Sequence, residues 1–331
     1  MYDYFYIQAF NLLFLIHKKT GSLLTIFLIK DMSLGFFMLS IRSQFCFFTA
    51  KPDIIALLKQ EIQHRFKDLR LAFSSKTLLT YKHPAQGYSL LDLATSGVIF
   101  CEHLGLSFSD AVSKDCVQWA IAANQNLFLL AAKRPHDLPF NLDVIKNLQK
   151  EFKEPNPQPS RAYYKIKEAT QRFGIAFKPG ALALEIGSAP GGTSLFLLEQ
   201  DLFVMGVDAA QMDLRVAKHP RFTHLTHVMN KLDKEQLKGV CYLLIDVNIS
   251  SFEVASFLRH YLSHPHNLKS IFWTVKWTRD LNFKNLNTLQ KHLKKLGASH
   301  ICMRHLTHQK NEFLCIIDFT SKPMRLDVRP A

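Results

Sequence analysis

The sequence lacks the residue patterns of a metal centre. Its 331 residues include six cysteines, but no two of them form a CxxC pair, and the histidines show no ligand spacing. No metal site is therefore predicted. The cysteines are expected to be buried free thiols of a cytoplasmic, reducing compartment. They are Cys46, Cys101, Cys116, Cys241, Cys302 and Cys315.

Apolar runs long enough to cross a bilayer are also missing. Residues 4–16 and 23–29 are strongly apolar, but basic residues 17–19 separate them, and neither half has the roughly 20 residues of a spanning helix. A secretory signal is not predicted, because its positive charge would precede the apolar core. Since Met38 stands directly before a convincing domain start, we interpret residues 1–37 as an upstream extension, of the kind that a mis-assigned translation start produces.

Acidic residues are few compared with basic ones. The chain has 27 Asp and Glu against 41 Lys and Arg, which gives a formal net charge of +14. Such an excess is typical of proteins whose partner is a polyanion, although a merely basic soluble protein is the alternative. With 48% apolar and 21% charged residues the chain is globular, and its length allows two domains.

The first folded part is predicted to be a small α+β domain over residues 38–150. Two rounds of strand, helix and strand suggest a ferredoxin-like or THUMP-like sandwich. Residues 151–160 contain three prolines at alternate positions and predict an extended linker. The expected elements are strands at 39–48, 69–81, 96–101 and 127–132, and helices at 53–66 and 109–122.

A Rossmann-like α/β domain is predicted over residues 161–321, followed by a tail at 322–331. Ser160 is expected to cap its first helix and Gly174 to end it. Alternating strands and helices predict a twisted, mostly parallel sheet with helices on both faces and a final edge hairpin. Strands are expected at 181–186, 202–207, 240–245, 270–275, 300–305 and 313–319, and helices at 161–173, 193–199, 250–260 and 285–295.

A Gly-rich turn follows the first strand of this domain. Residues 187–192, Gly-Ser-Ala-Pro-Gly-Gly, connect strand to helix, where glycines permit positive φ and close ligand approach. The turn is not the dinucleotide fingerprint, because Pro190 stiffens it and no third glycine follows at the required place. Asp208 ends the next strand, where Rossmann-like sheets bind ribose hydroxyls. Turn and acid together predict a site for a nucleoside-bearing cofactor, and a tight turn with a surface carboxylate is the alternative.

Ionisable residues stand at the ends of three predicted strands. Asp246 and Lys276 each end an apolar run, and Glu312 opens the last strand. Ligands of α/β sheets bind outside the carboxyl ends of the strands, so these groups border the predicted site, where partial desolvation perturbs pKa values. Each residue alone is also consistent with a solvated strand end. The set becomes specific when Lys165, on the preceding helix, is added.

At these positions the sequence resembles the FtsJ-type RNA 2′-O-ribose methyltransferases. The resemblance covers residues 160–319 and implies a class I methyltransferase fold, S-adenosyl-L-methionine (AdoMet) as cofactor, and RNA, expected to be ribosomal RNA, as substrate. We expect a monomer with no membrane partner. The motifs that carry the resemblance are SRAYYK at 160–165, GSAPGG at 187–192, Asp208, Asp246, Lys276 and HLTHQKNE at 305–312.

The resemblance also implies roles for individual residues. A Lys-Asp-Lys-Glu tetrad surrounds the target ribose, and it maps onto Lys165, Asp246, Lys276 and Glu312. Lys276 is the expected base. To accept a proton, Lys276 must be neutral part of the time. Burial and the positive charge of Lys165 lower its pKa and favour the neutral form, whereas the two carboxylates raise its pKa. The residues expected to bind the cofactor are Ser160, Glu185, Gly187, Ser188, Ala189, Pro190, Gly191, Gly192, Asp208, Val228 and Asp246.

Two positions depart from the family pattern. Glu185 stands where the family has Asp, and Val228 stands where the family has an acidic residue for the adenine amino group. Adenine would then depend on packing, backbone contacts, His227 or Asn230. These departures leave an alternative, a weak or inactive RNA-binding protein with a methyltransferase fold. Trp277 is expected either to stack on an unpaired base or to pack on the sheet.

Overall fold

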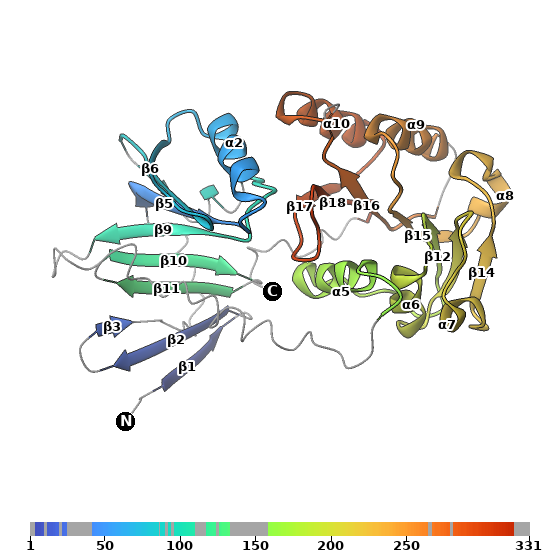
Figure 1. Ribbon diagram of the computed structural model, residues 1–331, viewed down its shortest axis with the longest axis horizontal. Coiled ribbons are helices and arrows are strands. Elements are labelled where there is room, and N and C mark those ends of the chain that lie inside the picture. The colour runs from blue at the N-terminus through green and yellow to red at the C-terminus, as the bar shows by residue number, and fades with distance from the viewer. Residues whose placement is uncertain are drawn as a thin grey trace. The chain divides into compact units, whose positions relative to one another are not determined.

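The chain folds into two compact units in the computed structural model (Figure 1). The boundary, between residues 156 and 157, falls within the predicted linker, most of which lies outside the described residues. No helix in the described part of the chain is long and apolar enough to span a membrane. The structure describes residues 4–9, 12–19, 22–24, 42–85, 87–89, 92–93, 96–109, 117–123, 126–132, 158–263, 267–278 and 281–320.

The first unit contains a six-stranded antiparallel sheet in the order β11-β10-β9-β5-β7-β6. Two further small sheets are present: β2 pairs with both β1 and β3 within the predicted extension, and β4 pairs with β8. The elements are β1 (Tyr4–Ala9), β2 (Leu12–Lys19), β3 (Ser22–Leu24), β4 (Arg42–Ser43), β5 (Phe45–Thr49), α2 (Ile55–Arg65), β6 (Arg70–Ser74), β7 (Leu78–Lys82), β8 (Tyr88–Ser89), β9 (His103–Ser109), β10 (Val117–Ala123) and β11 (Asn126–Ala132).

This sheet differs from the predicted one in its second half. The predicted helix at 109–122 is wrong, because β9 continues to Ser109 and β10 occupies Val117–Ala123. A short apolar run does not distinguish a helix from a buried strand, and here antiparallel pairing with β9 and β11 decides for the strand. The strand expected at 96–101 begins instead at His103. In the first half, α2 connects β5 to β6 with β7 between them, a split βαβ unit.

The second unit is a seven-stranded sheet in the order β14-β13-β12-β15-β16-β18-β17. The first five strands in this order are parallel, and β18 is antiparallel to both of its neighbours. Its elements are α5 (Ala162–Phe173), β12 (Leu182–Ile186), α6 (Gly192–Glu199), β13 (Phe203–Val207), α7 (Leu214–Ala217), β14 (Phe222–Leu225), η2 (Met229–Lys231), α8 (Lys234–Leu237), β15 (Val240–Ile245), α9 (Ser251–Leu262), β16 (Ser270–Lys276), α10 (Phe283–Lys295), β17 (His300–Arg304) and β18 (Glu312–Asp318).

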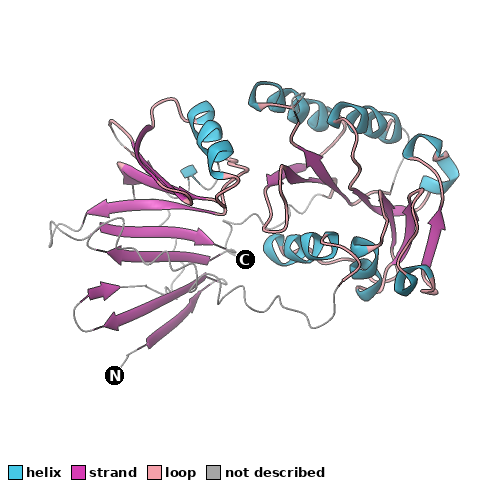
Figure 2. Ribbon diagram, in the orientation of Figure 1, coloured by secondary structure: helices cyan, strands magenta, loops and turns pink. Residues whose placement is uncertain are grey.

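Helices cover both faces of this sheet, with α5 and α6 on one side and α9 and α10 on the other (Figures 1 and 2). Strands covered on both faces need near-continuous apolar sequence, and β12, β15 and β16 are buried along most of their length. The helix boundaries follow local signals: Ser250 caps α9, and Gly174 ends α5 in the left-handed conformation at φ 60°. The predicted Rossmann-like α/β fold is confirmed for this unit.

The final hairpin is present, but only one of its strands lies at the edge of the sheet. Strand β18 inserts between β16 and β17, which leaves β17 outermost. Its residues Phe313–Asp318 are all buried, as expected for an internal strand. This insertion places the start of β18 beside the end of β16, so that Glu312 is the direct cross-strand partner of Lys276.

Candidate active site

The structure brings the four predicted tetrad residues together at one edge of the sheet. Asp246 directly follows β15, and Lys276 ends β16. Glu312 begins β18, and Lys165 reaches the same point from α5. Segments separated by up to 147 positions thus converge, since parallel strands end at one edge and β18 starts there.

These four side chains form a closed ring of alternating charge. Lys165 Nζ lies 3.2 Å from Asp246 Oδ2 and 2.6 Å from Glu312 Oε1. Lys276 Nζ lies 2.7 Å from Asp246 Oδ1 and 2.6 Å from Glu312 Oε2. Each ammonium group therefore contacts both carboxylates, and each carboxylate contacts both ammonium groups. The side chains are 12–23% exposed, so the ring is partly shielded from water yet open on one side.

The ring determines the direction of two pKa shifts. Burial alone would lower the pKa of Lys276, but the charges and hydrogen bonds of Asp246 and Glu312 outweigh it, and the pKa lies above the usual lysine value. Burial alone would raise the pKa of Glu312, but hydrogen bonds from Lys165 and Lys276 hold it below the usual range. The ring thus favours the charged forms of Lys276 and Glu312, and the lowered lysine pKa expected of a base is not present in the structure.

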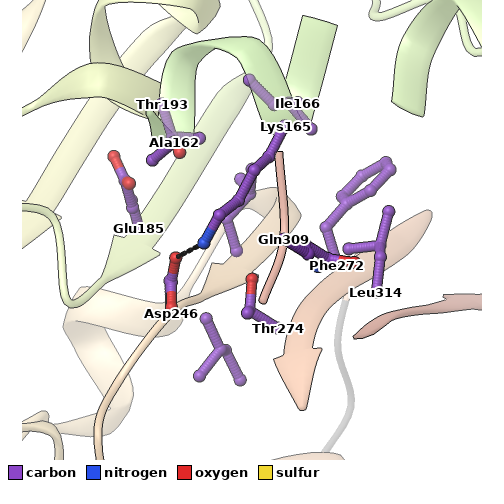
Figure 3. Close-up of a pocket in the computed structure, with 12 residues that line it drawn as sticks. Ala162, Lys165, Ile166, Glu185, Thr193, Asp246, Phe272, Thr274, Gln309 and Leu314 are labelled. Carbon is purple, nitrogen blue, oxygen red and sulfur yellow. Dashed lines mark hydrogen bonds and ion pairs between the residues drawn. The ribbon is translucent and has the colours of Figure 1, made fainter. Parts of the chain in front are cut away.

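A pocket lies between α5 and the sheet, bordered by Lys165 and Asp246 (Figure 3). Its floor is partly polar, because Glu185 of β12 and Thr274 of β16 face it. Gln309, from the loop before β18, also borders it: its side-chain oxygen accepts from Leu306 N–H at 2.8 Å, and its amide nitrogen is buried with no hydrogen-bond partner in the structure. Apolar side chains form most of the remaining lining, so polar groups and an apolar wall meet in this pocket.

Glu185 is the most strongly perturbed carboxyl group of the site. It is 2% exposed and accepts a hydrogen bond from Ser194 Oγ at the start of α6. Burial raises its pKa to about 8, with a further contribution from the charge of Asp246, and the hydrogen bonds from Ser194 and Thr193 offset only part of this. Glu185 is therefore mainly a neutral carboxylic acid at pH 7.

The Gly-rich turn packs tightly against its surroundings, which explains why positions 187 and 192 are glycines. A Cβ on Gly187 would lie 2.2 Å from the backbone oxygen of Asp246, and its φ is +82°. A Cβ on Gly192 would lie 2.3 Å from Ser160 Oγ. The turn is thus in direct contact both with the tetrad aspartate and with the residue before α5. Only glycine fits these two positions.

Asp208 lies beside the turn, as predicted. Its carboxylate accepts from Ala189 N–H at 3.0 Å and from Ala210 N–H at 2.9 Å, and these bonds fix its orientation next to the turn. Carboxylate oxygens have further acceptor capacity, which suits the hydroxyls of a ribose. The turn follows β12, where the strand order reverses because β13 pairs with one edge of β12 and β15 with the other, and this is the usual ligand crevice of such sheets.

The adenine end of the predicted cofactor site is less well supplied with polar groups. Val228 follows β14 and is 56% exposed, an unusual position for an apolar side chain. His227, one of the candidate replacements, has its Nε2 3.5 Å from Nε2 of Gln236. The side chain of Asn230 lies outside what the structure describes.

Other predictions concern residues around the site. Trp277 is partly buried and its ring packs against Phe283 and Phe313, at 4.7 and 6.2 Å, which favours the packing interpretation. Among the described cysteines, Cys241 is partly exposed and the others are buried free thiols, while Cys116 lies outside the description. No group of three potential metal ligands occurs in the described ranges.

Glu168, which no sequence pattern identified as a site residue, binds the loop before Glu312. Its carboxylate accepts hydrogen bonds from Thr307. The available signal was its spacing: Glu168 lies three residues after Lys165 and so occupies the same helix face. Thr307 carries no comparable signal, because only the fold brings it to α5.

Comparison with known proteins identifies the same unit. Residues 158–317 match the model of a family described as FtsJ-like methyltransferase. The Ribosomal RNA large subunit methyltransferase M of Cellvibrio japonicus is 29% identical over 124 residues, which cover 36% of this chain and 35% of that protein. The protein of the same name from Pseudoalteromonas translucida is 22% identical over 198 residues, 57% of this chain and 53% of that protein. The chain thus matches about half, or less, of the length of these relatives.

Proposed function

Because residues 158–317 belong to the FtsJ-like methyltransferases, we propose that this chain transfers a methyl group from AdoMet to a ribose 2′-hydroxyl of ribosomal RNA. The similarity to proteins named Ribosomal RNA large subunit methyltransferase M and the net charge of +14 support the choice of substrate. The observation that carries the proposal is the closed ring of Lys165, Asp246, Lys276 and Glu312 beside the Gly-rich turn.

The residues present fit AdoMet at its methionine and ribose ends. Residues 187–192 form a turn with positive φ at Gly187 and Gly191, and Asp208 is fixed beside it with acceptor capacity for a ribose diol. Asp246 connects the two sites, because its backbone carbonyl packs against Gly187 while its side chain belongs to the ring. When bound, AdoMet supplies a methyl group made electrophilic by its sulfonium sulfur.

The ring would activate and hold the acceptor hydroxyl. In the proposed step the hydroxyl oxygen bonds to the methyl carbon while the methyl–sulfur bond breaks, and the hydroxyl proton moves to Nζ of a neutral Lys276 and then to solvent. Lys165 would hold the oxygen in line, and Asp246 and Glu312 would orient the two ammonium groups. Positioning of this kind accounts for much of the rate enhancement in reactions between two bound groups.

The unliganded geometry sets a condition on this step. Since both carboxylates keep Lys276 charged, it can accept a proton only after it loses a carboxylate contact or gains a neighbouring positive charge. A ribose hydroxyl that enters the open side of the ring would compete for one of these contacts. Base catalysis by Lys276 is therefore proposed for the complex with both substrates, not for the free protein.

A methylation map tests the proposed function. Ribosomal RNA from cells with and without the gene is compared for 2′-O-methyl groups, and the deletion strain is complemented with wild type or with Lys276→Ala. We expect one methyl group to disappear, to return with the wild type, and to stay absent with the variant. An exposed lysine of α10, Lys291→Ala, is the matched control and should restore the methyl group. An unchanged map in the deletion strain contradicts the proposal.

A methyltransferase-fold RNA-binding protein without activity is the second candidate. The exposed Val228 and the charged resting state of Lys276 favour it. Calorimetric measurement of AdoMet binding distinguishes the enzyme from the inactive RNA-binding protein. Binding in the micromolar range supports the enzyme, while no detectable binding, together with retained binding of ribosomal RNA, supports the alternative.

A further inference from the structure

We infer that Glu168 is a positioning residue, which fixes the loop between β17 and β18 to helix α5 and thereby holds Glu312 opposite Lys165. The inference rests on the proposed function for its kinetic consequence, but its structural part does not depend on it. Glu168 is outside the tetrad and outside the predicted cofactor site. Its side chain contacts neither of them directly in any hydrogen bond or ion pair that the described residues show.

Glu168 is bound to the loop by three hydrogen bonds from one residue. The backbone N–H of Thr307 donates to both carboxylate oxygens, at 2.9 and 3.0 Å, and Thr307 Oγ1 donates to Oε1 at 3.0 Å. The carboxylate is 16% exposed, and charge-assisted bonds in such a setting are stronger than bonds between neutral groups. Thr307 is therefore fixed against α5 in both position and orientation.

The loop is stiff enough to pass this restraint on to Glu312. Leu306 N–H donates to Gln309 Oε1 at 2.8 Å, and Gln309 N–H donates to Leu306 O at 3.0 Å. His305 Nδ1 donates to the backbone oxygen of Glu312 at 2.8 Å, which closes the base of the loop. The short connection from Thr307 to Glu312 is thus held by hydrogen bonds within the loop, which restrict how far its two ends can shift relative to each other.

The helix supplies the second half of the restraint. Lys165 and Glu168 lie three residues apart on α5, on one face of the helix. Helix α5 therefore meets the hairpin through Glu168 with Thr307, through Lys165 Nζ with Glu312 Oε1 at 2.6 Å, and through the ring contact of Tyr164 with His308 at 5.2 Å. Removal of the first contact leaves a ring contact and an ion pair on a long flexible side chain to hold this loop against α5. Lys165 and Glu312 should then separate.

The expected consequence is a change in the ionisation of Glu312. Its carboxylate faces Lys165 from α5 and Lys276 from β16, with Asp246 as the other anion of the ring. Both lysines lower the pKa of Glu312. If the contact with Lys165 lengthens, the pKa of Glu312 rises toward its usual value, and the ring loses its acidic member at a higher pH than in the wild type.

The experiment compares Glu168→Ala with Arg172→Met. Arg172 is an ionic partner of Glu168, with Nη1 3.8 Å from Oε1, so its removal takes a positive charge from the same carboxylate while the three hydrogen bonds from Thr307 to Glu168 remain. Methyl transfer to ribosomal RNA from the deletion strain is followed with labelled AdoMet. For Glu168→Ala we expect kcat to fall roughly tenfold, KM for AdoMet to stay within about twofold, and the acidic limb of the pH profile to move upward. Arg172→Met should leave all three unchanged.

A second measurement needs no activity. The titration of Glu312 is followed by carboxyl carbon NMR, with Glu312→Gln to assign the signal, and its midpoint should rise in Glu168→Ala but not in Arg172→Met. If the proposed function fails, the NMR result still tests the positioning role. If Glu168→Ala does not fold, Thr307→Val, which removes one of the three bonds, should give a smaller shift in the same direction. Equal titration midpoints in the folded variants and the wild type overturn the inference.

Discussion

Replacement of Glu185 by Gln should change how the stability of the protein depends on pH. The side chain is 2% exposed, and burial raises its pKa to about 8 in the folded protein, against 4.5 for an ordinary glutamate. A raised folded pKa means that folding favours the protonated form. The protonated carboxyl group of Glu185 therefore makes its full contribution to the free energy of unfolding below pH 4.5, and this contribution is lost as the pH rises toward 8. Glutamine cannot ionise, so E185Q should not lose it.

The size of the effect follows from the two pKa values. Each pH unit between them costs about 1.4 kcal/mol of unfolding free energy in the wild type. At pH 7 the loss relative to the fully protonated form is about 3 kcal/mol, and well above pH 8 it levels off at about 5 kcal/mol. Glutamine keeps an oxygen that can accept from Ser194, so the substitution itself should cost little.

Urea unfolding of the full chain measures this difference, followed by tryptophan fluorescence, to which Trp273, buried in the same sheet, contributes. The unfolding free energy of E185Q minus that of the wild type is determined at pH 5, 7 and 9. We expect the difference to rise by several kcal/mol over this range. Glu253→Gln, on the exposed face of α9, controls for the removal of a carboxylate. A difference that stays constant with pH would refute the assignment of Glu185 as a neutral acid.

Two further predictions concern the cofactor site. Gly187→Ala should unfold at a lower urea concentration than Gly180→Ala. Both residues have positive φ, but only a Cβ at Gly187 would meet the backbone oxygen of Asp246. Gly180→Ala should therefore lose about 1–2 kcal/mol of unfolding free energy, and Gly187→Ala should lose more. Equal losses for the two variants would show that the close approach does not matter. Val228→Asp should lower the calorimetric Kd for AdoMet roughly tenfold, since a carboxylate would accept from the adenine amino group. An unchanged Kd would place adenine away from Val228.

The periodicity of apolar residues and the positions of turn residues were sufficient to locate most helices and strands of the second unit. The predicted strand at 240–245 coincides with β15, because its uninterrupted apolar run is bounded by Gly239 and Asp246. The short strand β14 was missed, because its sequence Phe-Thr-His-Leu is partly exposed and has no clear period. In the first unit the helix predicted at 109–122 failed for the opposite reason: an apolar run fits both a helix and a buried strand, and only distant pairing decides.

The members of the tetrad could be predicted from sequence, but their arrangement could not. Strand ends identified Asp246, Lys276 and Glu312, and Lys165 was added with the family resemblance. Their closure into a ring depends on the insertion of β18 between β16 and β17, which no local pattern encodes. The direction of the Lys276 pKa shift was equally out of reach, because burial and the carboxylates act in opposite directions and only the distances decide between them.

The neutral state of Glu185 has a consequence for the ring above it. Two ammonium groups and two carboxylates balance one another, and Asp246 belongs to both the ring and the surroundings of Glu185. Ionisation of Glu185 would add a third negative charge on the buried side, where water screens it least, and would favour protonated lysines still further. A base in this site therefore functions best while Glu185 keeps its proton. The longer side chain, buried against Ser194 and Thr193, is consistent with that requirement, because burial rather than any single partner is the main reason for its raised pKa.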